Sequence, residues 1–188
     1  FWVAPLHDIG KVGIPEAILR KQDRLTADEF EIIKTHSVLG WQAMQDAEKR
    51  LGMQADFLAI AKDVTLHHHE RWDGGGYPAG LAGEDIPVAA RLMAVADVYD
   101  ALVSWRPYRQ PLSHEDALRI MRDGKGKHFD PDILDAFVEN HEEFQMIAER
   151  YADTAAGLRT PAAHQIRQAP SSETMHGPTG LRGVQAEP

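Results

Sequence analysis

The sequence predicts an all-α fold. Residues 26–29, TADE, form a capping box, in which the Thr26 hydroxyl and the Glu29 carboxylate satisfy backbone N–H groups at the start of a helix. Apolar residues then recur at alternating spacings of three and four, which is the period of a helix face. Residues 88–103 are apolar almost all round and predict a buried central helix. No segment of the sequence is convincing as a β-strand.

Residues 1–25 are expected to form one buried helical segment and a loop. The opening FWVAPLHDIG resembles the interior of a buried helix more than a natural start. Residues 11–25 are predicted to be a loop with a short helix near Pro15–Leu19. Because residue 1 is Phe, we expect the chain to be an N-terminally truncated fragment of a longer protein.

A first long helix is predicted from Thr26 onward. Its helical stripe consists of Phe30, Ile33, Ser37, Gly40 and Met44. His36 lies at the flank of this stripe, so its side chain is expected to point toward the margin of the core.

A second helix is predicted to begin near Asp56 and to end near Glu70 to Asp73. Its inward face consists of Phe57, Ala61, Val64 and His68. A histidine that continues an apolar face points inward. Residues 67–69 are all histidines, and they cannot all share that face because consecutive helical residues are about 100° apart. We therefore expect His68 to point inward and His67 to be a bystander.

The stretch HHHERWDGGGYP at residues 67–78 combines metal ligands with a flexible loop. Imidazoles are good ligands for divalent metals. The glycines adopt dihedrals that other residues avoid, so the backbone can lie close to a bound molecule. The simpler alternatives are a solvated histidine cluster followed by a flexible turn. The loop is expected to continue to Pro87, which suits the first turn of a helix.

The predicted central helix, Val88–Val103, carries three charged residues, Arg91, Asp97 and Asp100. A buried carboxylate must be paired or must bind a metal, since an unpaired buried charge costs several kcal/mol. This argument makes Asp97 a candidate metal ligand. The RPYR segment that follows is predicted to be a loop, and its Arg106 and Arg109 carry planar donors that suit phosphate or guanine. A solvated basic loop is the alternative.

The last third of the sequence predicts three more helices and a tail. Ser113 with Asp116 begins a helix that Gly124 closes. The dipeptide at 130–131, Asp-Pro, begins the next, and a final helix is expected over residues 144–151. We predict one domain over residues 1–153 and a disordered tail over 154–188, where periodicity is lost. Five histidines have no evident partner and are expected to be surface or satisfied polar residues: His114, His128, His141, His164 and His176.

Composition excludes several classes of protein. The net charge of −9 argues against nonspecific binding to DNA, which requires a basic face. It permits an anionic substrate, because bound metal ions reverse the local sign of charge. Without cysteine there is no disulfide or zinc-thiolate site, so a metal must bind histidines and carboxylates. No apolar run approaches the roughly 20 residues of a membrane span, so no membrane contact is expected from this segment.

His7 and Asp8 are adjacent, one nitrogen and one oxygen ligand, and Lys11 follows. Lys11 is suited to donate to a phosphate or to a metal-bound hydroxide. Taken alone, the pair and the lysine are equally typical of an ordinary surface.

Five motifs stand in the order HDIGK, THSVLG, HHHERWDGGGYP, ARLMAVADVYDAL and RPYR. This series, over about residues 3–145, resembles the HD-GYP family, the cyclic di-GMP phosphodiesterase branch of the HD metal-dependent phosphohydrolases. The resemblance implies an HD-domain helical bundle with a GYP-loop extension. It also implies two or three divalent metal ions, often iron or manganese. Ligand positions that the family has upstream of the HD pair are absent from this sequence.

The resemblance also implies roles for individual residues. The implied metal ligands are His7, Asp8, His36, His68, His69 and Asp97. Asp8 and Lys11 are the implied catalytic residues, with Asp8 bridging two metals. Substrate contacts are implied for Gly76, Tyr77, Pro78, Arg106 and Arg109.

The implied activity is hydrolysis of cyclic di-GMP to pGpG, GMP or both. The domain is expected to be the cytoplasmic output end of a bacterial two-component protein of the response-regulator type. An upstream receiver or sensor domain is an expected partner, and GGDEF-type signalling proteins are further candidates. Two alternatives stay open: an HD phosphohydrolase of another nucleotide, and an inactive module that binds a cyclic dinucleotide or a protein.

Overall fold

The computed structural model describes residues 3–21, 23–52, 56–105 and 110–151. Within these ranges the chain is helical, and its one strand-like pairing is an isolated bridge between Lys125 and Phe129. The predicted all-α fold is therefore confirmed. The α-helices are α1 (Glu16–Leu19), α2 (Ala27–Leu51), α3 (Asp56–His67), α4 (Val88–Val103), α5 (His114–Asp123), α6 (Pro131–Glu139) and α7 (His141–Arg150). Short 3₁₀ helices are η1 (Ala4–Leu6), η2 (Ile9–Gly13) and η3 (Gly83–Asp85).

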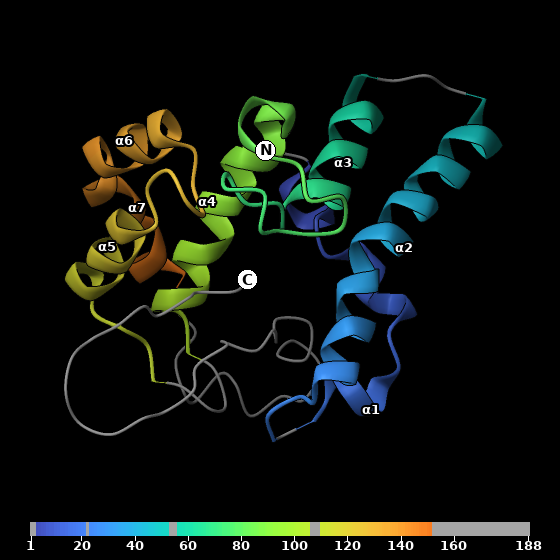
Figure 1. Ribbon diagram of the computed structural model, residues 1–188, viewed down its shortest axis with the longest axis horizontal. Helices are drawn as coiled ribbons and strands as arrows, with labels where there is room; N and C mark the ends of the chain where they lie inside the picture. Colours follow the sequence, from blue (N-terminus) through green and yellow to red (C-terminus); the bar gives the residue numbers. More distant parts are fainter. Residues whose placement is uncertain (1–2, 22, 53–55, 106–109, 152–188) are drawn as a thin grey trace.

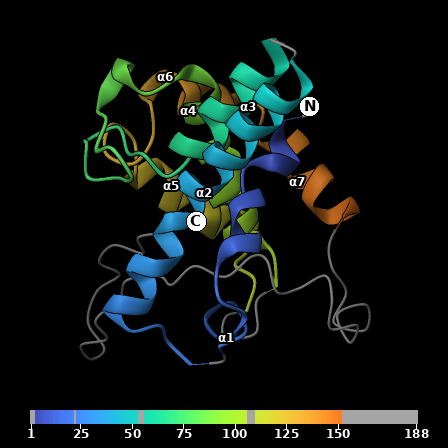
Figure 2. The same cartoon turned by 90° about the vertical axis from the view of Figure 1, so that its right-hand side faces the viewer.

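Helix α4 lies between two groups of helices (Figure 1). On one side α2 packs against α3 and η2, and α3 in turn packs against α4. On the other side α4 packs against α5 and α6. The view turned by 90° shows α2 and α3 side by side, as their contacts require (Figure 2). This arrangement brings the first residues of the chain, the histidine run and α4 toward one another.

The predicted helix caps are present. Glu29 N donates to Thr26 Oγ1 at 3.2 Å and Thr26 N donates to Glu29 Oε2 at 2.7 Å, which completes the capping box of α2. The Ser113 hydroxyl accepts from the backbone of α5, and the Asp130 carboxylate accepts from the backbone of α6. These local signals fixed the starts of three helices correctly.

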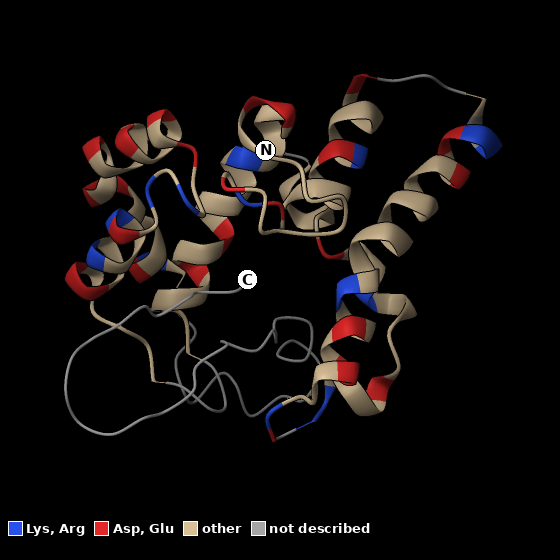
Figure 3. Cartoon of the chain, in the orientation of Figure 1, with Lys and Arg blue, Asp and Glu red and all other residues tan. Residues whose placement is uncertain are grey.

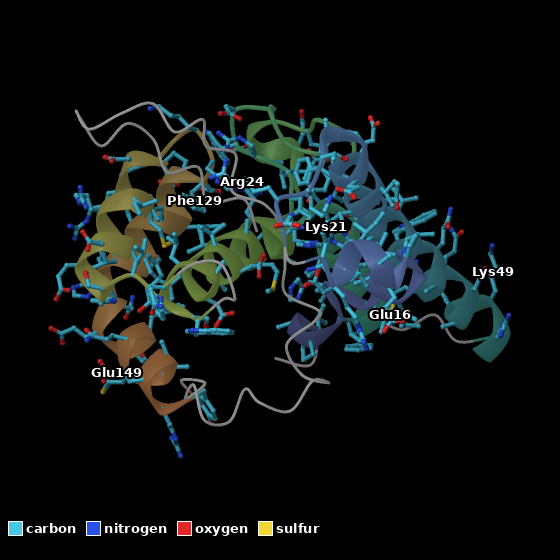
Figure 4. The ribbon with its side chains drawn as sticks, turned by 90° about the horizontal axis from the view of Figure 1, so that it is seen from below. Glu16, Lys21, Arg24, Lys49, Phe129 and Glu149 are labelled. Atoms are coloured by element: carbon cyan, nitrogen blue, oxygen red, sulfur yellow. The ribbon has the colours of Figure 1, made fainter. Side chains whose placement is uncertain are left out.

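A hydrophobic core fills the space between α4, α5 and α6. Its buried members are Val95, Val98, Tyr99, Leu102, Ala117, Leu118, Met121, Phe129, Leu134 and Phe137. Figure 4 shows Phe129 on this side of the molecule, whereas Glu16 and Lys49 lie on the side formed by α1 and α2. Burial of these apolar side chains holds α4 in place.

A buried ion pair connects α4 to the start of α6. Arg91 Nη1 donates to Asp130 Oδ2 at 2.7 Å, and Arg91 Nε donates to Ile86 O at 2.8 Å. Burial alone would raise the pKa of Asp130, but Arg91 and the backbone donors of α6 lower it. The carboxylate therefore stays charged and serves as both ion-pair partner and helix cap.

The first residues differ from the prediction. We expected the interior of a buried helix over residues 1–10, but residues 4–6 and 9–13 form two 3₁₀ turns. Pro5 is the second residue of the first turn, which begins at Ala4. The second lies so close to α2 that a Cβ on Gly10 would be 1.9 Å from His36 O. Direct backbone contact, rather than an apolar helix face, therefore fixes this segment.

Two further predictions differ from the structure, and a third concerns residues outside the described ranges. Helix α4 was predicted to be a buried central helix, but its apolar residues Val88 and Leu92 are 56% and 53% exposed. Helix α7 begins at His141, three residues before the predicted start, and ends at Arg150. The predicted tail, residues 154–188, lies outside the described residues.

Acidic and basic residues are interspersed along the helices (Figure 3). Among the described residues, none of the helices is both long enough and apolar enough to cross a bilayer.

Three of the histidines without a predicted partner have one in the structure. Tyr99 Oη lies 2.8 Å from His114 Nδ1, and His114 Nε2 lies 2.9 Å from His141 Nδ1. The ring of His128 stacks on Phe129 with the centroids 4.5 Å apart. His164 and His176 lie outside the described residues.

We predict that His128 makes the fold sensitive to acid. Burial, followed by the charge of Arg71, lowers its pKa to about 4, against 6.5 for an ordinary histidine. The unfolded chain therefore binds a proton between these pH values while the folded chain does not, so the free energy of unfolding falls as pH falls from 6.5 to 4. At about 1.4 kcal/mol per pKa unit, the loss attributable to His128 is about 3 kcal/mol at pH 4.

The His128→Phe substitution keeps the ring stack and removes the titration. Chemical denaturation at pH 7 and pH 4 should show a smaller acid loss for this variant than for the wild type, by about 3 kcal/mol. Equal losses in the two proteins would show that His128 does not control this part of the pH dependence.

Candidate metal centre

The histidine run reaches the centre because α3 ends early. We predicted the helix to end near Glu70 to Asp73, but it ends at His67. The next residues form a turn in which Glu70 N donates to His67 O at 3.0 Å. Once the helical rotation stops, His68 and His69 are both free to point the same way, and both are buried.

Four predicted ligands come together in one group, namely Asp8, His36, His68 and His69. Each offers one ligand atom, and these atoms all lie within 4.8 Å of one another. His36 Nε2 lies 3.1 Å from His69 Nε2, 3.4 Å from His68 Nε2 and 3.4 Å from Asp8 Oδ1. The segment before η2, helix α2 and the end of α3 thus each contribute to one buried cluster.

Backbone carbonyls orient three of the imidazole rings. The Nδ1 atoms of His7, His36 and His68 lie 2.6, 2.7 and 2.9 Å from the carbonyl oxygens of Ala4, Ile33 and Val64. In a neutral ring, an Nδ1–H that donates to a carbonyl leaves Nε2 with its lone pair, which is the arrangement typical of metal-binding histidines. In all three rings Nε2 is the atom directed to the carboxylates or to another histidine of the centre.

His7 connects this group to Asp97. His7 Nε2 lies 3.3 Å from Asp8 Oδ2 and 3.6 Å from Asp97 Oδ1. The structure therefore brings together all six residues for which the resemblance implies metal binding. Asp97 lies on α4. The potential ligands therefore come from the segment before η2, from α2, from the end of α3 and from α4.

The carboxylates of Asp8 and Asp97 stabilise a positive charge between them. Burial would lower the pKa of His7, but its hydrogen bonds to Asp8 and Asp97 raise it to about 10. Burial would raise the pKa of Asp8, but His7 and the charge of Lys11 hold it well below its usual range. Asp97 likewise has a lowered pKa because of His7, against the effect of its own burial. A proton on His7 thus lies between the two carboxylates that a metal ion would contact.

The other three histidines are held neutral. Burial, followed by the charge of His7, lowers the pKa of His68 to about 3. Burial also lowers the pKa of His69 and of His36. Neutral imidazole is the form that binds metals, so no proton has to be removed from these three rings at neutral pH.

The residues fit a divalent cation. Asp8 Oδ1 is buried and has no hydrogen-bond partner, although it lies in the middle of the histidine group. An unsatisfied buried carboxylate oxygen is costly unless a cation meets it. Three neutral imidazoles and a carboxylate are suitable donors for iron, manganese or zinc.

Lys11 is a buried cation at the edge of the centre. It is 5% exposed, and its Nζ donates to Asp8 Oδ2 at 2.7 Å. One oxygen of Asp8 thus binds Lys11 while the other is free for a metal. The ammonium is fixed where it can also meet an anionic substrate.

Gly10 and Gly40 permit this geometry, and neither was predicted as a site residue. A Cβ on Gly10 would lie 1.9 Å from His36 O and 2.5 Å from Gly40 N, and a Cβ on Gly40 would lie 2.3 Å from Thr65 Cγ2. Only glycine allows η2, α2 and α3 to approach so closely. The sequence signal was present as the glycines of HDIGK and THSVLG, but spacing alone did not show what they contact.

The GYP loop, here residues 76–81 and named for Gly76, Tyr77 and Pro78, packs on one histidine of the centre. The ring of Tyr77 lies 4.7 Å from that of His69 at 33°, and Tyr77 N donates to His69 O at 3.2 Å. A Cβ on Gly76 would lie 2.4 Å from Arg71 N and 2.5 Å from His69 O, so this position also requires glycine. The Tyr77–Pro78 peptide bond is cis. The contacts between Tyr77 and His69 thus pack the loop directly onto the histidine run.

Glu70 anchors the loop and was also missed as a site residue. It is 2% exposed, and its carboxylate accepts from Ala79 N at 2.7 Å and from Leu81 N at 3.1 Å. Its other neighbour is His67, whose Nδ1 lies 3.6 Å from Glu70 Oε1. His67 lies outside the four-residue group, in agreement with its expected place as a bystander.

We predict that Glu70→Gln loosens the GYP loop. The amide keeps one acceptor, but its NH₂ group faces a backbone N–H, which leaves a buried donor unsatisfied at a cost of about 1–3 kcal/mol. The expected result is a free energy of unfolding lowered by about 1–3 kcal/mol, the cost of that unsatisfied donor. Chemical denaturation of Glu70→Gln and of Glu84→Gln, an exposed acid of η3, measures the difference. Equal free energies of unfolding in the two variants would contradict the anchoring role.

The remaining predicted substrate contacts cannot be placed. Arg106 and Arg109 lie outside the described residues. Gly76 and Tyr77 lie beside His69, and Pro78 follows Tyr77 through a cis peptide bond.

The chain belongs to the HD domain family, whose model matches residues 3–133. This family binds divalent metals, in agreement with the donor set of the cluster.

Within this family the chain is similar to proteins that act on cyclic dinucleotides, which confirms the resemblance seen in its motifs. It is 53% identical over 152 residues to a cyclic di-GMP phosphodiesterase of Vibrio cholerae, covering 81% of this chain and 31% of that protein. It is 39% identical over 153 residues to the cyclic di-GMP phosphodiesterase response regulator RpfG of Xanthomonas campestris, covering 81% and 39%. It is 39% identical over 150 residues to 3′3′-cGAMP-specific phosphodiesterase 2 of V. cholerae, covering 80% and 28%. The chain thus spans roughly a third of the length of these relatives.

Proposed function

We propose that this chain is the catalytic domain of a metal-dependent phosphodiesterase that hydrolyses cyclic di-GMP to pGpG, GMP or both. The observation that carries the proposal is the buried cluster of Asp8, His36, His68 and His69, beside which lie a fixed lysine and the GYP loop. The chain is 53% identical to a protein named cyclic di-GMP phosphodiesterase and 51% identical to one named probable cyclic di-GMP phosphodiesterase.

Two or three divalent ions, iron or manganese, are proposed to bind the six clustered residues. The ligands would be His7, Asp8, His36, His68, His69 and Asp97. When bound, such ions supply a water nucleophile at neutral pH and neutralise charge on the phosphate.

The residues of the chain prepare the site for this chemistry. Hydrolysis adds water across one P–O3′ bond: the hydroxyl joins phosphorus and the proton goes to the departing 3′ oxygen. Lys11 is held by Asp8 with its ammonium fixed in a buried setting, where it stabilises negative charge on the phosphoryl oxygens more strongly than it would in water. The carbonyls that orient the imidazoles keep this geometry fixed.

The loop residues Gly76, Tyr77 and Pro78 are proposed to bind the nucleotide. The Tyr77 ring packs on His69, so a molecule that contacts this ring also lies next to the cluster. Arg106 and Arg109 are proposed to hold a guanine through their planar donors.

The wider context is proposed from the relatives. One of them is a response regulator, which supports a role as the output domain of a bacterial two-component protein behind a receiver or sensor domain. Cytoplasmic location and contact with GGDEF-type proteins stay predictions.

A second substrate has a specific observation in its favour. Relatives at 34–39% identity are named 3′3′-cGAMP-specific phosphodiesterases, and 3′3′-cGAMP differs from cyclic di-GMP in one base. The identities to the cyclic di-GMP phosphodiesterases reach 53%, which favours cyclic di-GMP.

A substrate panel tests the proposal. The manganese- or iron-loaded chain is incubated with cyclic di-GMP, 3′3′-cGAMP, ppGpp and nucleoside monophosphates, and kcat/KM is measured for each by chromatography. The proposal expects the highest kcat/KM for cyclic di-GMP. A preference for ppGpp or a monophosphate would assign the chain to another HD phosphohydrolase class. Binding of cyclic di-GMP without turnover would indicate an inactive binding module.

A further inference from the structure

Lys34 lies next to the GYP loop, although none of the motifs assigns it a role. It projects from α2, and its Nζ lies 5.4 Å from the centroid of the Tyr77 ring and 4.9 Å from that of Phe30. Lys34, Phe30 and Tyr77 are all partly exposed. A cation and two aromatic rings therefore meet at the surface of the site.

The metal centre fixes the position of this group. Tyr77 packs on His69 with the ring centroids 4.7 Å apart, and Phe30 meets Tyr77 edge to face at 6.4 Å and 83°. A single aromatic ring thus separates the Lys34 ammonium from a histidine of the cluster. Phe30 and Lys34 are four residues apart on α2, so they share one face of the helix and support Tyr77 together.

The ion pair that Lys34 makes is easily exchanged. Its Nζ donates to Glu31 Oε1 at 2.7 Å, and the Glu31 side chain is 68% exposed. Exposed pairs of this kind stabilise a protein by about 0–1 kcal/mol. A phosphate can therefore replace Glu31 as the partner of the lysine, because breaking the exposed pair costs little and the new ammonium–phosphate contact is again charge-assisted.

The charge of the proposed substrate requires a second cation. A cyclic dinucleotide carries two phosphates on opposite sides of one ring, and only one of them is cleaved at a time. Lys11 is committed to the cluster through Asp8, and Arg71 is held by Asp73 through two hydrogen bonds. In a chain with a net charge of −9, the phosphate that is not being cleaved needs a cation close to the GYP loop.

We propose that Lys34, supported by Phe30 and Tyr77, binds the phosphate of the cyclic dinucleotide that is not being cleaved. This inference rests on the proposed function and adds a subsite on α2 to it. It makes Lys34 a substrate-binding residue that sets affinity for two-phosphate substrates and takes no part in bond cleavage.

Two substrates separate this role from a general effect on the active site. Cyclic di-GMP has a second phosphate, whereas bis(4-nitrophenyl) phosphate has one phosphate and no ribose. For Lys34→Ala the proposal expects KM for cyclic di-GMP to rise about tenfold with kcat within twofold of wild type, about 1.4 kcal/mol of binding by conversion. It expects kcat/KM for bis(4-nitrophenyl) phosphate to be unchanged.

Further variants sharpen the test. Lys34→Arg should keep the KM for cyclic di-GMP close to the wild-type value, whereas Lys34→Glu should raise it beyond the value of Lys34→Ala. Glu31→Gln should lower this KM slightly, because it removes the carboxylate that competes with the phosphate. Lys62→Ala, which breaks a comparable pair with Glu48, is the matched control and should change nothing. Equilibrium dialysis with a slowly hydrolysed phosphorothioate analogue of cyclic di-GMP measures affinity independently of turnover.

The outcomes distinguish the subsite from the proposed function. If wild type hydrolyses cyclic di-GMP but Lys34→Ala has an unchanged KM and affinity, the subsite is wrong and the function stands. If Lys34→Ala lowers turnover of both substrates equally, Lys34 acts on the active site as a whole and the subsite is again wrong. If wild type hydrolyses no cyclic dinucleotide, the proposed function fails, and dialysis alone then decides whether Lys34 binds the second phosphate.

Discussion

Asp8→Ala is expected to abolish turnover of cyclic di-GMP. Asp8 contributes an unsatisfied buried oxygen to the histidine group and also holds Lys11, so its loss removes a proposed metal ligand and releases the lysine that is proposed to be catalytic. A loss of about 4 kcal/mol of transition-state stabilisation corresponds to about a thousandfold in rate, and losing both contributions should reach at least this value.

Helicity should be largely intact in this variant, because Asp8 lies outside the α-helices. The variant also removes a repulsion between the partly buried carboxylates of Asp8 and Asp97, which limits the loss of stability. Asp63→Ala on α3, an exposed aspartate, is the matched control and should keep wild-type kinetics. Near-normal turnover by Asp8→Ala, or an equal loss in the control, would contradict the site.

Gly10→Ala is expected to disable the site without changing any ligand. The added Cβ would meet two backbone atoms of α2, His36 O at 1.9 Å and Gly40 N at 2.5 Å, and backbone cannot rotate away as a side chain can. The His7–Asp8 segment must therefore move off α2, which separates Asp8 from His36. Metal affinity should fall at least 100-fold, about 2.7 kcal/mol, as measured by competition with a chelating dye.

Gly13→Ala is the control for this substitution. Its Cβ would lie 2.9 Å from Leu39 Cδ1, the end of a flexible side chain, so a small rotation relieves the contact. We expect metal affinity within about threefold of wild type, about 0.7 kcal/mol. If both glycine variants bind metal as tightly as wild type, close contact between η2 and α2 does not set the geometry of the centre.

The elements that the sequence predicted well depend on local chemistry. Thr26, Ser113 and Asp130 each accept hydrogen bonds within their own helix start, so nearby residues were enough to find these helices. The inward direction of His68 followed from the apolar face that it continues. Asp97 followed from the need of a buried carboxylate for a partner. The other ligands were named from the order of the motifs, and periodicity alone did not group them.

The features that escaped prediction depend on contacts between distant segments. The close approach of Gly10 to α2 links residues 30 positions apart. The early end of α3 follows from a turn whose Glu70 carboxylate binds the backbone of residues 79 and 81. The pairing of His114 with His141 likewise joins two helices. No local pattern specifies such partners, although glycines and a glutamate inside the motifs marked where they lie.

The measurement that tests the central claim most directly is chelator-reversible hydrolysis of cyclic di-GMP. The chain is purified anaerobically, loaded with iron or manganese, and incubated with the substrate, and products are resolved by chromatography. We expect linear pGpG or GMP to form, to disappear on chelation and to return when metal is added back. Absence of product from the fully loaded chain, or product formation that neither a chelator nor Asp8→Ala affects, would contradict the account.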